Sequence, residues 1–167
     1  MDRLNYFSSG IINGYFEGLG KAGEENSNLC KGSYCYDFKS VRQKFNDGTI
    51  NETDLKEIME YGKGLEIGFN HGFLEYFEPV HSDFLKDNKD FHKHTYQTME
   101  FTDMNLLEVT TYLLQHHAAN KMMDKIDFEE NKNTNEMFER EFLSILRDEK
   151  NVLLMCRFTK EKFWNKD

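Results

Sequence analysis

Glycine recurs at every fourth position in two separate segments of this 167-residue chain, and a larger apolar residue follows each of these glycines. The six glycines are Gly10, Gly14 and Gly18 in the first segment and Gly64, Gly68 and Gly72 in the second. Positions four apart lie on one face of an α-helix. The spacing therefore predicts two helices, over residues 3–20 and 51–78, each with a smooth groove beside a ridge of large side chains.

Such a pattern is expensive for a helix. Glycine inside a helix is less favourable than alanine by about 0.8–1.0 kcal/mol, so the six glycines together cost about 5–6 kcal/mol. Close approach of two backbones offsets this cost, because the missing Cβ atoms let helices come nearer than the usual distance of about 8–10 Å. We therefore predict that the six glycines form a packing face together with Tyr15, Phe69 and Phe73, which follow three of them.

Three hypotheses for what fills the two grooves stay open at the level of sequence. The two helices can cross one another within the chain. Alternatively, the grooves receive a partner protein in an assembly, by the close packing best known from membrane helices. In the third hypothesis, the glycines clear space for a small apolar ligand such as a lipid tail.

The remaining segments also favour helices. Asn51, with Asp54 three residues later, fits the start of the long helix, and the single proline, Pro79, fits its end. Apolar residues at helical spacing predict further helices over residues 36–45, 82–91, 103–126 and 135–148, with loops over 21–34 and 127–134. Any strand content is minor and confined to residues 95–102 and 152–159. The short apolar run 152–158 fits a strand or a buried helix, and the helix is favoured. The predicted fold class is mostly α: a single compact domain, residues 1–167, of about five or six helices.

Composition narrows the function classes. A net charge of −9 argues against general nucleic-acid binding, which needs a basic surface. No apolar window reaches the ~18 residues of a membrane span, and the first residues do not resemble a signal peptide. We therefore expect an intracellular protein, either cytoplasmic or carried into a mitochondrion by an internal signal.

The C-terminal segment, residues 151–167, is basic and aromatic in contrast to the rest of the chain. It contains Arg157, Lys160, Lys162 and Lys166 between Phe158, Phe163 and Trp164. Basic and aromatic residues together suit peripheral contact of residues 157–166 with a membrane or an acidic partner. Docking of this tail on the chain's own acidic surface is the alternative interpretation.

Residues with reactive side chains form no complete catalytic motif. His71 and Glu75 stand one helical turn apart and are the best candidates for a shared metal ion. Cys30 and Cys35 either form a disulfide in an oxidising compartment or stay as two thiols. No cofactor is expected from the sequence.

The leading functional hypothesis is a non-catalytic helical accessory subunit that packs within a larger protein assembly, with other protein subunits as its partners. One alternative is a metal-dependent helical enzyme that uses His71 and Glu75. The other alternative is a helical protein that binds a small apolar ligand or lipid.

Overall fold

A computed structural model describes residues 5–25, 34–80, 106–125 and 135–164, and these residues form helices without any strand. The predicted mostly α fold is confirmed for this part of the chain. Residues 152–159 lie inside a helix, as favoured for the run 152–158, so that segment contains no strand. The helix expected over 82–91, the strand over 95–102 and the loop over 127–134 lie outside the described residues.

The chain divides into two compact units, residues 1–81 and 82–167, which are described one at a time. The single domain of residues 1–167 stays a prediction. The first unit contains three helices: α1 (Tyr6–Glu25), α2 (Phe38–Asn46) and α3 (Glu52–Phe77). The second unit also contains three among its described residues: α6 (Leu106–Lys125), α7 (Asn135–Arg147) and α8 (Glu149–Phe163).

Helix α1 is longer than the sequence predicts. It starts after Asn5, whose side chain accepts a hydrogen bond from the amide of Ser8 at 2.9 Å. It continues past the expected end at residue 20 as far as Glu25, so residues 21–25 of the expected loop 21–34 are helical. The cause is apolar packing, because Ala22 is fully buried against Phe69 and Phe73. Tertiary contact here outweighs the local loop signals.

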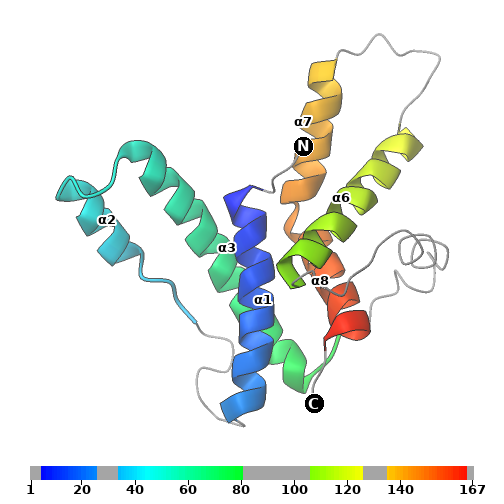
Figure 1. Ribbon diagram of the computed structural model, residues 1–167, viewed down its shortest axis with the longest axis horizontal. Helices are drawn as coiled ribbons and strands as arrows, with labels where there is room; N and C mark the ends of the chain where they lie inside the picture. Colours follow the sequence, from blue (N-terminus) through cyan, green and yellow to red (C-terminus); the bar gives the residue numbers. More distant parts are fainter. Residues whose placement is uncertain (1–4, 26–33, 81–105, 126–134, 165–167) are drawn as a thin grey trace. The chain divides into compact units, whose positions relative to one another are not determined.

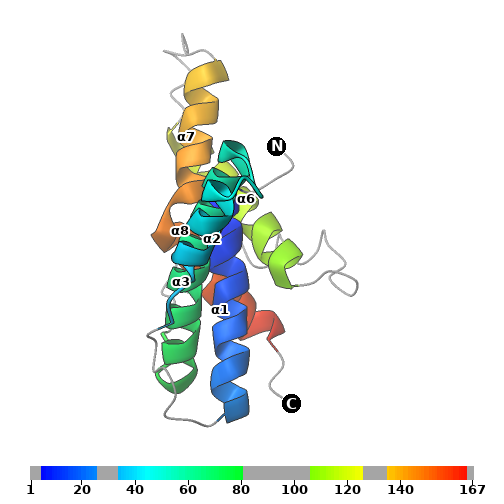
Figure 2. The same cartoon turned by 90° about the vertical axis from the view of Figure 1, so that its left-hand side faces the viewer.

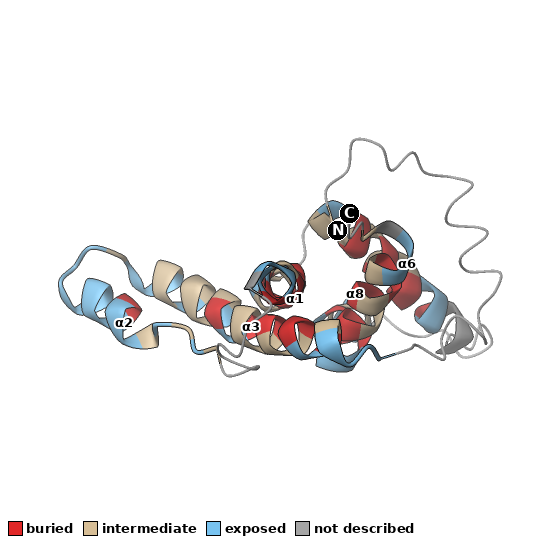
Figure 3. Ribbon diagram, turned by 90° about the horizontal axis from the view of Figure 1, so that it is seen from below, coloured by how far each residue is buried: buried red, intermediate tan, exposed pale blue. Residues whose placement is uncertain are grey.

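Helices α1 and α3 lie side by side and run in the same direction (Figures 1 and 2). A parallel pair needs a connection that carries the chain back to its starting end. Residues 26–51, which include α2, provide this connection. Helix α2 packs against α3 through its buried residue Val41. Along most of α3, buried residues alternate with residues of intermediate exposure (Figure 3), as expected for a helix that is covered on one face only.

Helix α3 begins and ends close to the predicted positions. The Asn51 side chain accepts a hydrogen bond from the amide of Asp54 at 2.8 Å, and the helix ends at Phe77, two positions before Pro79.

We expect Asn51→Ala to lower the free energy of unfolding by about 1 kcal/mol, because it leaves an amide of the first turn without its acceptor. Asn51→Asp keeps the acceptor and is the control. Urea denaturation measures both, and equal stability of the two variants would contradict this capping role.

In the second unit, α6 packs against both α7 and α8. The core of the second unit contains buried apolar residues of α6, of α8 and of the end of α7. Among them are Val109, Leu113, Leu114, Ala118, Met122, Leu146, Val152, Met155 and Phe158. One buried polar contact joins α6 to α8: the hydroxyl groups of Thr110 and Thr159 lie 2.9 Å apart. The Thr159 hydroxyl donates to the carbonyl of Met155, and the single proton of the Thr110 hydroxyl has the Thr159 oxygen and the carbonyl of Leu106 as alternative acceptors, so both hydroxyls have a partner.

His117 makes the stability of the second unit depend on pH. Burial lowers the pKa of His117, and the positive charge of Lys121 lowers it further. In the unfolded chain His117 binds a proton as the pH falls through about 6.5, whereas in the folded chain it binds one only at a lower pH. The contribution of His117 to the free energy of unfolding is therefore fully present above about pH 6.5 and is lost as the pH drops below that value. We expect the urea midpoint of the wild type to fall more between pH 7.5 and 5.5 than that of His117→Gln. Equal slopes in the two proteins would contradict this assignment.

Candidate binding site on the first unit

The six predicted glycines line the contact between α1 and α3. A Cβ atom built on Gly14 would collide with the carbonyl oxygen of Leu65 and lie 2.8 Å from the amide nitrogen of Phe69. A Cβ atom built on Gly68 would collide with the carbonyl oxygen of Ile11. The other four glycines also face backbone of the opposite helix: Gly10, Gly18, Gly64 and Gly72. The space beside all six glycines is thus filled by main-chain atoms from within the same chain.

This contact is reciprocal. Glycines of α1 meet carbonyl groups of α3, and glycines of α3 meet carbonyl groups of α1, in the same order along both helices. The hydrogen atom that replaces each Cβ therefore points at a carbonyl oxygen, which is the geometry of weak Cα–H···O contacts at close helix interfaces.

Among the described residues, no helix combines the length and the apolar character needed to cross a bilayer.

The aromatic residues that follow the glycines lie beside this contact. Tyr15 and Phe73 are almost completely buried, and Phe69 is buried as well. The Phe69 ring packs against Phe73 with centroids 6.2 Å apart and against Tyr34 at 4.6 Å. The rings thus form a small apolar cluster where α1 and α3 meet.

A buried carboxylate joins the two helices near this cluster. The Tyr15 hydroxyl donates a hydrogen bond to Glu75 Oε1 at 2.9 Å, and only 4% of the surface of Glu75 is exposed. The Nδ1 atom of His71 lies 3.3 Å from Glu75 Oε2. The sequence pairs His71 with Glu75 by their spacing but gives no sign of Tyr15, which is distant along the chain.

The structure brings together both residues proposed as metal ligands, His71 and Glu75. Within residues 5–25, 34–80, 106–125 and 135–164, no group of three or more His, Cys, Asp or Glu side chains is placed to hold a metal ion. The hydroxyl of Tyr15 supplies one partner for the Glu75 carboxylate instead. The metal site at His71 and Glu75 stays a prediction.

Two other sequence predictions fall partly outside the described residues. Cys35 is exposed, and Cys30 is not among the described residues, so their disulfide stays a prediction. In the basic and aromatic segment, Phe158 is buried in the second unit, whereas Lys162 is exposed. Phe158 therefore packs in the core and does not face a partner. Contact of residues 157–166 with a membrane or an acidic partner stays a prediction.

An open groove of about 570 Å³ lies between α2 and α3, and none of the sites predicted from the sequence coincides with it. It is lined by Phe38, Lys39, Arg42, Gln43 and Asn46 of α2 and by Met59 and Lys63 of α3. Lys39, Arg42, Gln43 and Asn46 follow the i, i+3, i+4, i+7 spacing of one helical face. That spacing, in a helix whose only charged residues are basic, is the signal from which the groove wall was predictable.

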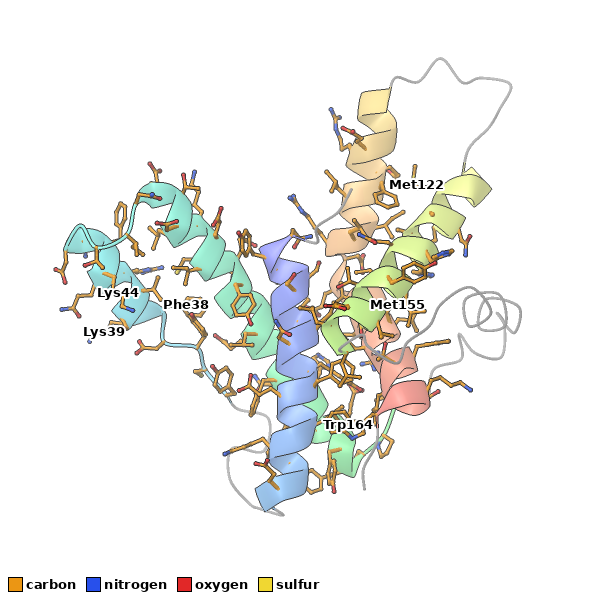
Figure 4. All side chains as sticks on the ribbon, in the orientation of Figure 1. Phe38, Lys39, Lys44, Met122, Met155 and Trp164 are labelled. Atoms are coloured by element: carbon orange, nitrogen blue, oxygen red, sulfur yellow. The ribbon has the colours of Figure 1, made fainter. Side chains whose placement is uncertain are left out.

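A further glycine fixes the position of α2 on α3. A Cβ atom on Gly62 would lie 2.6 Å from the Tyr36 ring and 3.0 Å from the Phe38 ring. The two rings therefore rest on the backbone of α3, and the amide of Tyr36 also donates to Glu66 at 3.2 Å. Figure 4 shows Phe38 on the side of α2 that faces α3, with the long side chains of Lys39 and Lys44 extending from the same helix.

The chain matches no protein-family model, no curated protein and no solved structure.

Proposed function

We propose that this protein is a non-catalytic helical subunit that binds another protein within a larger assembly. The observation that carries the proposal is the open groove between α2 and α3, which has two apolar side chains, Phe38 and Met59, among polar ones. The glycine faces of α1 and α3 do not carry it, because each is filled by the other helix. Their role in this proposal is to hold α3 in place as one wall of the groove.

Several contacts tie α2 and the segment before it to this wall. Val41 is buried in the contact between α2 and α3, and the backbone of Tyr34 exchanges two hydrogen bonds with the Asn70 side chain, at 2.7 and 3.2 Å. Together with the rings on Gly62, they hold both walls before any partner arrives. A preformed groove reduces the ordering cost of association, which favours a role in binding.

The exposure of the groove favours a protein segment over a small molecule. Pockets for small molecules usually enclose their ligand, burying about 70–90% of its surface. Here five lining residues are exposed, namely Lys39, Arg42, Gln43, Asn46 and Lys63. A shallow groove between two helices is instead typical of sites that receive one face of an amphipathic helix.

The size of the particle that contains the protein in its native cells tests this function. We expect the tagged wild type to elute in gel filtration with light scattering at a mass well above 19.9 kDa, together with other polypeptides at a fixed ratio. Met59→Glu places a charge in the groove while keeping a good helix former, and we expect it to release the protein from that particle. Leu74→Glu is the matched control, because Leu74 is an exposed apolar residue of α3 outside the groove.

Two outcomes would contradict the proposal. One is a wild-type protein that elutes as a monomer. The other is a Met59→Glu variant that stays in the assembly with an unchanged circular dichroism spectrum.

A further inference from the structure

The charged side chains that line the groove are all positive. Lys39, Arg42 and Lys63 line it, and none of the residues that the structure places in its lining is acidic. Lys63 lies 3.9 Å from Glu60, but both side chains are more than half exposed, so that ion pair is weak. The chain as a whole carries a net charge of −9, so this local excess of positive charge runs against the average composition.

We infer that the groove binds an acidic amphipathic helix of a partner protein, an inference that rests on the function proposed above. The apolar face of that helix packs on Phe38 and Met59. Its carboxylates face Lys39 and Arg42 on one side and Lys63 on the other. Arg42 adds selectivity for carboxylates, because its planar guanidinium group can hold both oxygens of one carboxylate at once.

The overall negative charge of the protein does not oppose this contact at short range. At physiological ionic strength, charges on the surface are screened over about 8 Å. A carboxylate inside the groove therefore interacts mainly with the three cations that line it.

Three synthetic helical peptides test the inference with the full chain. They share one leucine face and carry glutamate, glutamine or lysine on the opposite face, and fluorescence anisotropy measures their binding. We expect the glutamate peptide to bind about tenfold or more tightly than the other two, with an affinity that falls as salt is added. The double variant Lys39→Glu/Arg42→Glu should lose at least about tenfold of that affinity.

The matched control is Arg147→Glu/Lys150→Glu, which makes the same change in net charge at exposed positions of α7 and α8. It should bind the glutamate peptide as the wild type does. Circular dichroism establishes that both double variants are folded. Equal loss in both variants would show that only net charge matters and would overturn the inference.

The remaining outcomes separate this inference from the function on which it rests. If the glutamine peptide binds as tightly as the glutamate peptide and Met59→Glu weakens both, the charge selection is wrong while docking in the groove stands. If the glutamate peptide does not bind, the inference is overturned, and the particle size in native cells decides the function separately. If phosphatidylserine vesicles bind through Lys39 and Arg42 and the glutamate peptide does not, the groove is a membrane contact and the inference is wrong.

Discussion

The Gly68→Leu substitution should unfold the α1–α3 pair. The smaller substitutions Gly14→Ala and Gly68→Ala should each lower the free energy of unfolding by about 1–3 kcal/mol. A Cβ atom at either position collides with a carbonyl oxygen of the opposite helix, and backbone moves less easily than a side chain. The free-energy cost of this clash therefore exceeds the roughly 1 kcal/mol that alanine gains over glycine from its better helix propensity. Urea denaturation followed by circular dichroism measures the changes.

Gly23→Ala provides the matched control within α1. Gly23 is exposed, and the nearest atoms to a Cβ at this position belong to the Tyr76 side chain, at 3.2 Å, which can give way. We expect this variant to stay within about 0.5 kcal/mol of the wild type, because the gain in propensity and the shift of the ring oppose each other. Stabilisation by alanine at both Gly14 and Gly68 would show that the two helices are not in close contact.

The second large effect concerns the bond between Tyr15 and Glu75. We expect Tyr15→Phe to lower the free energy of unfolding by about 1.5–3 kcal/mol, because it removes a donor from a buried carboxylate. A double-mutant cycle with Glu75→Met, which keeps the length of the side chain but removes the carboxylate acceptor, isolates the pair from the other contacts of both residues. The coupling energy between the two substitutions should be at least about 1 kcal/mol.

The control for this cycle is another hydrogen bond between the same two helices. The Asn13 side chain donates to the Tyr61 hydroxyl at 3.1 Å, and both residues are only partly buried. Tyr61→Phe should cost about 0.5–1 kcal/mol, as a neutral and partly solvated bond does. Additive effects of Tyr15→Phe and Glu75→Met would mean that the two groups do not interact in solution.

Local signals in the sequence account for the positions of most helices. The long helix was expected over residues 51–78 and is observed over Glu52–Phe77, because the Asn51 cap and Pro79 act within a few residues of its ends. The last helix begins where Asp148 accepts hydrogen bonds from the amides of Lys150 and Asn151. Segment 152–159 was ambiguous between strand and helix because a short apolar run fits both.

Contacts between distant segments account for what the sequence did not show. The repeated glycines indicate close packing, but they contain no information on direction, so the parallel arrangement of α1 and α3 was not predictable from them. Tyr15 and Glu75 are 60 positions apart, and neither has a local pattern that names the other. The groove likewise needs two helices at once, since α2 alone shows only a basic face.

The most direct test of the account is whether the glycine faces of α1 and α3 meet within one chain. Nuclear Overhauser spectra report this at atomic level, because the Hα of Gly14 should lie next to the amide proton of Phe69 and that of Gly18 next to the amide proton of Phe73. We predict both cross-peaks in uniformly labelled protein and neither in a filtered experiment on mixed labelled and unlabelled chains. Cross-peaks that appear between different chains would contradict the account, because they would show that the glycine faces pack against a second chain.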